Sequence, residues 1–221
     1  MKKNILFILI IVFSSSCNFC RKKTLQIKSV DLETVTPDTL VYGEIFDESR
    51  NGLEAVCKFI GLSNLQKDQG NEDEIRFWFG YDRSDSAKII VLKKRGGSWQ
   101  SMIYFLKYSN DEKFYITSVE KRMEQGEPKS GWNVFFNKLE GLGLSKLKNF
   151  DKIPGYTLTT GGDQITIEIR KNNKYNRYEY PNYLVHLTET PLKEVDEVYE
   201  MALLMQEEFG YRLYPRPPME Y

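Results

Sequence analysis

The sequence predicts an α+β domain in which three helices pack on a mainly antiparallel sheet. Four segments between residues 75 and 118 either alternate apolar and polar side chains or are wholly apolar, and the turns between them are too short for crossover connections, which indicates a four-strand meander. A later pair of alternating segments predicts a C-terminal hairpin, and three other segments repeat their apolar residues at helical spacing. Aromatic residues make up 14% of the chain, a share that favours strands and packed faces.

The first 17 residues have the pattern of a secretion signal. Lys2 and Lys3 precede nine consecutive apolar residues over 5–13, which suits a signal h-region and falls short of the roughly 18 needed to span a bilayer. Serines at 14–16 and then Cys17 follow. This order resembles a bacterial lipoprotein signal peptide, in which the cysteine is acylated, for example with palmitate, and becomes the mature N-terminus. The resemblance implies a signal peptide over residues 1–16 and a lipid on Cys17.

The residues after the cysteine influence sorting in lipoproteins. Asn18 is not the aspartate associated with inner-membrane retention in enteric species, so the resemblance favours the outer membrane. The basic residues 21–23 differ from the acidic export signals that carry some lipoproteins to the cell surface, so we expect the protein to face the periplasm. Residues 17–40 are polar, and we expect them to tether a single globular domain over residues 41–221 to the membrane.

The domain is expected to begin with a helix over residues 48–61. Its apolar residues recur at helical spacing: Leu53, Val56, Cys57 and Ile60. Cys57 therefore lies on the apolar side and is expected to be a buried small hydrophobe. An oxidising envelope would also permit a disulfide between Cys57 and Cys20, and the sequence leaves this alternative open.

Four strands follow the first helix and form the predicted meander. Their alternating or wholly apolar runs lie at 75–81, 89–92, 99–105 and 114–118. The connectors at 83–86, 95–97 and 109–112 consist of Gly, Ser, Asn, Asp and other charged residues that favour tight turns. Because each connector is short, we expect consecutive strands to be antiparallel neighbours.

Two further helices lie on either side of the C-terminal hairpin in the sequence. The second helix is expected over residues 131–141, with Ser130 as its N-cap. Its expected core-facing stripe consists of Trp132, Phe135, Phe136 and Leu139. The third helix is expected over residues 191–209, with Thr190 as its cap and Gly210 at its end.

The hairpin itself carries the best candidate for paired catalytic carboxylates. Asn172 and Asn173 tolerate the positive φ of a tight turn, and this turn would place Glu168 and Glu179 on one face. A glycosidase needs only two carboxylates at a fixed separation. The arginines on the same two strands are Arg170 and Arg177. The competing interpretation is therefore a cross-strand ladder of opposite charges on the solvent side.

Charge and residue usage argue against several classes of function. The 31 basic and 31 acidic residues cancel, and removal of Lys2 and Lys3 with the signal leaves 29 against 31, a charge of −2. Such a balance argues against a nucleic-acid partner, because phosphate binding scales with Lys and Arg on one surface. With one histidine, His186, which is expected on a rim or loop, the chain offers few ligands for a zinc site, and we expect neither a metal nor a cofactor.

Aromatic side chains give the sequence its candidate binding surface. Trp78, Tyr104 and Tyr115 occupy the parity opposite to the core-facing residues of their strands, which would place their rings on the exposed side of the sheet. Grouped exposed rings are typical of sites that contact sugars, peptides or proteins. In the alternative interpretation, helices cover both faces of the sheet and these rings belong to a second layer of core.

These observations favour a non-enzymatic protein of the cell envelope. The chain resembles small lipoproteins of bacterial envelopes, and we expect it to be anchored in the membrane by its lipid and to bind an envelope protein or a glycan through the aromatic-rich surface. The alternative is a carboxylate-dependent hydrolase that acts on glycans.

Overall fold

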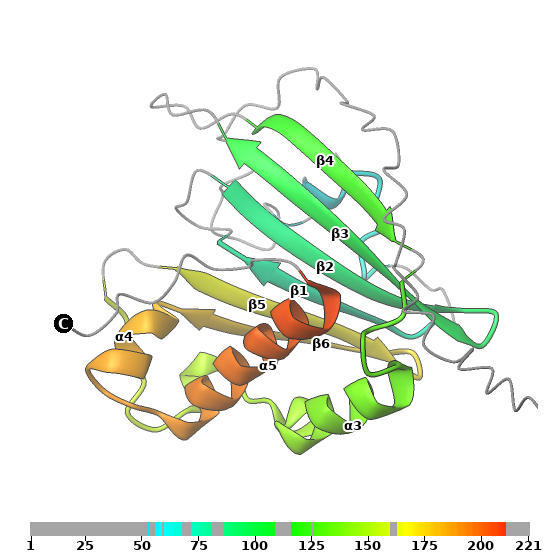
Figure 1. Cartoon of the computed structure of the whole chain (residues 1–221). Helices are drawn as coiled ribbons and strands as arrows, with labels where there is room; N and C mark the ends of the chain where they lie inside the picture. The colour runs from blue at the N-terminus through cyan, green and yellow to red at the C-terminus, as the bar shows by residue number, and fades with distance from the viewer. Residues whose placement is uncertain are drawn as a thin grey trace, which may run out of the picture.

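The computed structural model describes residues 53, 56–58, 60–67, 72–80, 86–108, 116–124, 126–159 and 163–210. The predicted signal peptide, Cys17, the tether, Tyr115 and residues 211–221 lie outside the described residues. The described part contains one six-stranded sheet in the order β4-β3-β2-β1-β5-β6, in which every pair of neighbours is antiparallel. Helices lie against this sheet (Figure 1), which confirms the α+β fold class with its meander and its C-terminal hairpin.

The strands match the predicted segments and are mostly longer. They are β1 (Glu74–Phe79), β2 (Ser86–Arg95), β3 (Ser98–Tyr108), β4 (Ile116–Glu124), β5 (Gln164–Lys171) and β6 (Lys174–Pro181). Glu74 at the start of β1 pairs with Lys93 near the end of β2 and with Arg170 near the end of β5. The β2–β3 turn and the β5–β6 turn therefore lie at the same end of the sheet, which we call the turn end.

Both turns at this end adopt left-handed backbone conformations. Gly96 and Gly97 connect β2 to β3 with φ values of 55° and 86°. Asn172 and Asn173 connect β5 to β6 with φ values of 52° and 61°, as the sequence predicted. Two consecutive residues with positive φ match the right-handed twist of the flanking strands, and Gly and Asn are the residues that tolerate them.

The helices of the C-terminal half lie on one face of the sheet, near β1, β5 and β6 (Figure 1). They are α3 (Trp132–Gly141), α4 (Tyr183–Thr188), α5 (Lys193–Phe209) and two 3₁₀ turns, η1 (Leu144–Lys146) and η2 (Phe150–Lys152). Helices α3 and α5 agree with prediction, whereas α4 was not predicted because six residues are too few to show a helical period. The predicted caps were wrong: Gly131 and Leu192 occupy the N-cap positions, and neither makes a side-chain capping bond.

The sheet has a hydrophobic core on each face. On the first face, β1 residues such as Phe77 and Phe79 pack with the cluster that includes Phe135 of α3 and Met201 of α5. On the second face, Leu53, Val56 and Cys57 belong to one cluster with these strand residues: Trp78, Ala87, Ile89, Val91, Tyr104 and Leu106. Leu53 and residues 56–58 are helical, in agreement with the helix predicted over 48–61. Burial on both faces explains why every residue of β1 is buried.

Candidate functional site

The aromatic surface predicted from strand parity is a second core. Trp78 is 0% exposed and Tyr104 is 1% exposed, because the segment that includes Leu53 and Cys57 covers their face of the sheet. The prediction that these two rings are exposed was therefore wrong, and the alternative of a sheet covered on both faces describes them. Tyr115, the third predicted residue, lies outside the described residues.

The predicted carboxylate pair lies on the same second face but not in a described cavity. Glu168 is 5% exposed, and its two oxygens accept hydrogen bonds from Trp78 Nε1 at 2.9 Å and from Tyr175 Oη at 2.7 Å. Glu179 is half-buried and pairs with Arg177. Both carboxylates therefore have hydrogen-bond or charge partners. These partners differ from the predicted cross-strand ladder, because Arg177 and Glu179 lie on the same strand, β6, and Glu168 is buried rather than on the solvent side.

Arg76 is the centre of a buried network on this face. Its side chain is 0% exposed, and Nε donates to Glu74 Oε1 at 2.6 Å while Nη1 donates to Cys57 Sγ at 3.3 Å. Glu168 Oε2 lies 4.0 Å from Nη1, and Lys93 Nζ lies 3.2 Å from Glu74 Oε2. Because each of these buried charges has an opposite charge beside it, the network is best understood as part of the core rather than as a reactive site.

Cys57 is an unreactive member of this network. It is buried, as the sequence predicted, and it is a free cysteine. Burial raises the pKa of its thiol to about 12, and the lowering by the Arg76 charge is smaller. A thiol that stays protonated at neutral pH is neither a nucleophile nor a metal ligand.

The single histidine is also part of the core. His186 lies in α4, is 0% exposed and is not on a rim or loop as predicted. Its Nδ1 lies 2.9 Å from Thr190 Oγ1, and its Nε2 lies 3.0 Å from the carbonyl oxygen of Thr157. These contacts bind α4 to the loops around it and leave both ring nitrogens occupied.

The turn end of the sheet holds two neighbouring cavities that share Asp73 and Lys94. The first has a volume of about 380 Å³ and a mostly apolar surface, and we call it the apolar cavity. Its apolar side chains come from the sheet, α3 and η1: Ile75, Trp99, Phe136, Leu144 and Ile169. The second has a volume of about 600 Å³, a mostly polar surface and a lining that includes both turns, and we call it the polar cavity. Together they form the turn-end cleft.

Aromatic rings form one wall of the apolar cavity. Trp99 pairs with Lys94 across the β2–β3 ladder, which directs its ring to the face that carries α3. Its centroid lies 4.5 Å from Phe136 and 6.2 Å from Trp132, both of α3. Phe136 and Trp132 are only half-buried, so the predicted core stripe of α3 is divided: Phe135 and Leu139 are enclosed, whereas Trp132 and Phe136 border the surface.

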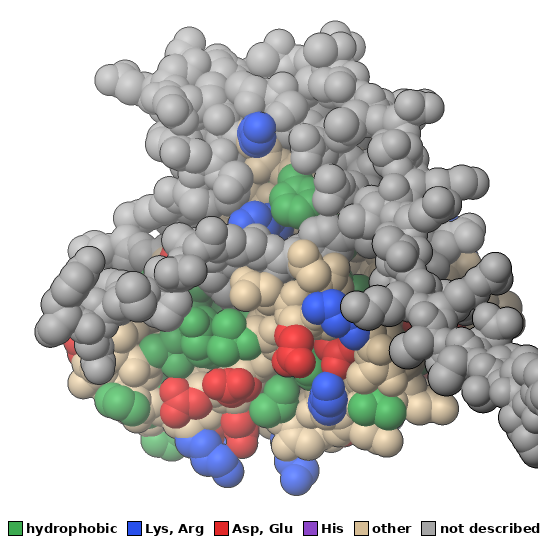
Figure 2. All heavy atoms as spheres, viewed as in Figure 1, with side chains coloured by type: hydrophobic (Ala, Val, Ile, Leu, Met, Phe, Trp, Pro, Cys, Tyr) green, Lys and Arg blue, Asp and Glu red, His purple; other side chains and the backbone are tan. Residues whose placement is uncertain are grey.

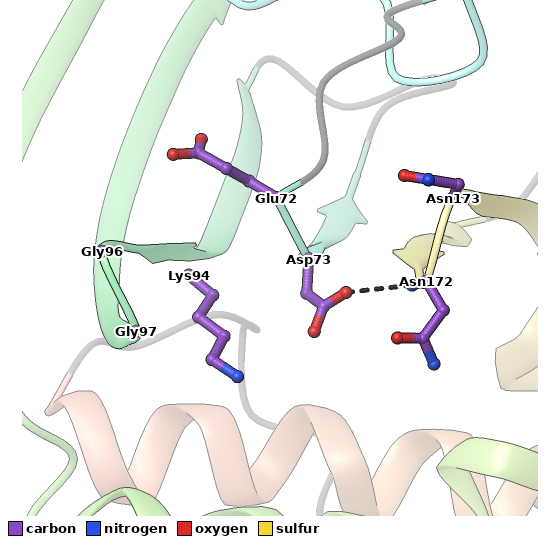
Figure 3. Close-up of a pocket in the computed structure, with 7 residues that line it drawn as sticks. All are labelled: Glu72, Asp73, Lys94, Gly96, Gly97, Asn172 and Asn173. Carbon is purple, nitrogen blue, oxygen red and sulfur yellow. Dashed lines mark hydrogen bonds between the residues drawn. The ribbon is translucent and has the colours of Figure 1, made fainter.

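Polar groups surround the mouth of the cleft. The side chains of Asp73, Lys94 and Asn172 extend toward the helices, whereas those of Glu72 and Asn173 extend away from them (Figure 3). An Asp73 carboxylate oxygen accepts the backbone N–H of Asn172 at 3.0 Å, which fixes the β5–β6 turn beside β1. The exposed side chains of Asn137, Glu140 and Lys171 add to the rim of the apolar cavity.

No model of a known protein family matches the sequence, and no curated protein matches it either. Within the described ranges, we find no helix long and apolar enough to cross a bilayer, and no group of three or more His, Cys, Asp or Glu side chains placed to hold a metal ion. The site must therefore be judged on its own geometry.

Sequence analysis did not find the turn-end cleft. It assigned Phe136 to the core-facing stripe of its helix, which is correct for the direction in which Phe136 points. The position of Trp99 offered a signal, since it is the second residue after the Gly96–Gly97 turn and a ring so close to a strand end is poorly placed to be enclosed. The cleft depends on where α3 ends against the sheet, and one sequence does not specify that distance.

Proposed function

We propose that this chain is a lipid-anchored protein of the bacterial cell envelope that acts by binding a ligand or partner in the turn-end cleft. The anchor rests on the lipoprotein-like pattern that ends at Cys17. The binding role rests on one observation, the apolar cavity of about 380 Å³ with its wall formed by Trp99 and Phe136. Its volume lies within the range of roughly 300–1,000 Å³ typical of ligand sites, and an apolar interior with a few polar groups at the mouth is their usual chemistry.

Catalysis is less well supported than binding. Glu168 and Glu179 line neither cavity of the cleft, and hydrogen bonds occupy both oxygens of Glu168. The described surface also offers little to a polyanion, since acidic and basic side chains are interspersed on the face shown in Figure 2. A partner that inserts an apolar group into the cleft fits these features better.

The test is capture from solubilised envelope extract by the full chain and two matched variants. Asn137→Trp places a bulky ring on the rim of the apolar cavity, whereas Asn133→Trp places the same ring one turn earlier on α3, at an exposed position that does not line the cavity. We expect the parent chain and Asn133→Trp to retain the same molecule and Asn137→Trp to lose it. Equal capture by all three chains would contradict the proposal. Turnover of a glycan that is lost in Asp73→Asn and Glu140→Gln would replace binding with hydrolysis.

A further inference from the structure

The cleft places a cation, Lys94, beside an apolar interior. Lys94 is half-buried and lines both cavities. The neighbouring cation Lys93 points to the other face, where its ammonium lies 3.1 Å from Glu72 and 3.2 Å from Glu74. No such ion pair is formed by Lys94 with any residue that the structure describes, although Asp73 is nearby, immediately before β1.

The carboxylates around Lys94 make no ion pair with it in the described part of the chain. Asp73 accepts the backbone N–H of Asn172, and Glu72 extends toward the opposite face (Figure 3). Glu140 lies on the exposed rim formed by α3. Lys171, at the end of β5, supplies a second exposed cation on the same rim and likewise has no ion pair within the described part of the chain.

We infer that the turn-end cleft binds molecules that join a carboxylate directly to an apolar body. This inference rests on the proposed binding function of the same cleft. The apolar body occupies the cavity against Trp99 and Phe136, and the carboxylate lies at the mouth, where Lys94 neutralises it. The ligand removes apolar surface from water and gives Lys94 the ion pair that it does not form with any described residue.

Two sources can supply this chemistry. One is a free aliphatic or aromatic acid, and the other is the C-terminal carboxylate of a peptide that ends in a large apolar residue. Both place the carboxylate next to the apolar group, so both fit the same arrangement of Lys94 and the apolar cavity. A matched set of probes can separate charge, apolar burial and source.

The first experiment titrates three octyl probes that differ only in the charge of the head group: octanoate, octanol and octylamine. The protein is the ¹⁵N-labelled mature chain, residues 17–221, with Cys17→Ser in every sample, so that no detergent competes for the cavity. The readout is the indole N–H signal of Trp99. Trp78 is the internal reference, because it is fully buried on the opposite face and donates to Glu168.

We expect octanoate to shift the Trp99 signal at the lowest concentration and octylamine at the highest. Lys94→Met retains the apolar stem of the side chain and removes its charge. We therefore expect it to lower the affinity for octanoate about fivefold and to change the affinity for octanol by less than about twofold, as the loss of one partly exposed ion pair requires. Raising the salt concentration should reduce the preference for octanoate. Asn137→Trp should lower the affinity for all three probes, whereas Asn133→Trp should leave the affinity for each probe unchanged.

The outcomes separate this inference from the proposed function. Equal binding of octanoate and octanol, or a preference that survives in Lys94→Met, would overturn the carboxylate preference while leaving a functional apolar cavity. Shifts of Trp78 equal to those of Trp99 would place the probes elsewhere and also overturn the inference. The proposed function is decided separately, by capture from the envelope extract.

A second arm identifies the source of the carboxylate. A short peptide with a free C-terminal Phe is compared with its C-terminal amide and with octanoate. If the free peptide binds more tightly than octanoate and the amide does not, the ligand of the cleft is the C-terminus of a peptide. Tighter binding of octanoate assigns it to free acids, and failure of both to shift Trp99 refutes the inference.

Discussion

Glu208 connects the end of α5 to the start of α3, and its replacement offers a quantitative test of the fold. Its side chain is 3% exposed although it is charged. Oε1 accepts from Lys138 Nζ at 2.6 Å and from Ser130 Oγ at 2.8 Å, and Oε2 accepts the backbone N–H of Ser130 at 2.8 Å. A carboxylate near the C-terminus of a helix is opposed by the helix dipole, so these bonds must offset both that cost and the cost of burial.

Glu208→Gln keeps the shape of the side chain and removes its charge. Hydrogen bonds to charged groups contribute about 1.5–3 kcal/mol each, but Lys138 is partly exposed and its ion pair contributes less. We therefore expect the free energy of unfolding to fall by about 1–3 kcal/mol in a urea titration at neutral pH. The matched control is Glu207→Gln, an exposed neighbour, for which we expect a change within about 0.5 kcal/mol.

The difference between the parent chain and Glu208→Gln should depend on pH. Burial alone would raise the pKa of Glu208, but the hydrogen bonds from Lys138 and Ser130 outweigh it and hold the pKa below its usual value. A group whose pKa is lower in the folded state stabilises that state above its unfolded pKa and loses this contribution as the pH falls through the folded pKa. We expect the two proteins to converge in stability under acidic conditions. A difference under about 0.5 kcal/mol at neutral pH, or one that stays constant down to acidic pH, would refute this account.

The remaining predictions concern the anchor and the two halves of the α3 stripe. Cys17→Ser should release the protein from the membrane fraction and abolish labelling by a palmitate analogue, and persistent labelling would rule out Cys17 as the lipidation site. Phe135→Ala should cost about 3–5 kcal/mol in a denaturant titration, because the Phe135 ring is 0% exposed and contacts Phe136 and Phe209. Phe136→Ala should lower the free energy of unfolding by less than Phe135→Ala does, because the Phe136 ring borders the apolar cavity. Equal decreases for the two variants would mean that the cavity wall is as enclosed as the core.

Local patterns in the sequence predict most of the architecture. The alternating pattern of apolar and polar residues predicts the strands and which of their residues share a face. The position of the Asn172–Asn173 turn predicts the register of the hairpin, in which Glu168 lies opposite Arg177. These features depend on a few neighbouring residues, so one sequence is enough to find them. Helix α4 was missed because its position is set by tertiary contacts such as those of His186.

The second face of the sheet shows the limit of that reasoning. Parity correctly placed Trp78 opposite the first core, but parity does not indicate whether another segment covers a face. The charges on this face suggested solvent, yet Arg76, Glu74 and Glu168 are buried because they neutralise one another. Charge pairing between residues far apart in the chain is invisible in a single sequence, and so is the gap between α3 and the turn end that forms the cleft.

The pairing of β1 with β5 has a consequence for the order in which the chain folds. Contacts within the meander join neighbouring strands, whereas Trp78 and Glu168, which join β1 to β5, are 90 residues apart in the sequence. Closing so long a loop is slow, so we expect the four-strand meander to form first and the C-terminal hairpin to add later. Until it does, β1 is an open edge with Phe77 and Phe79 uncovered, and another extended chain can pair there in place of β5. A chaperone that shields strand edges would therefore raise the yield of this protein most during that interval.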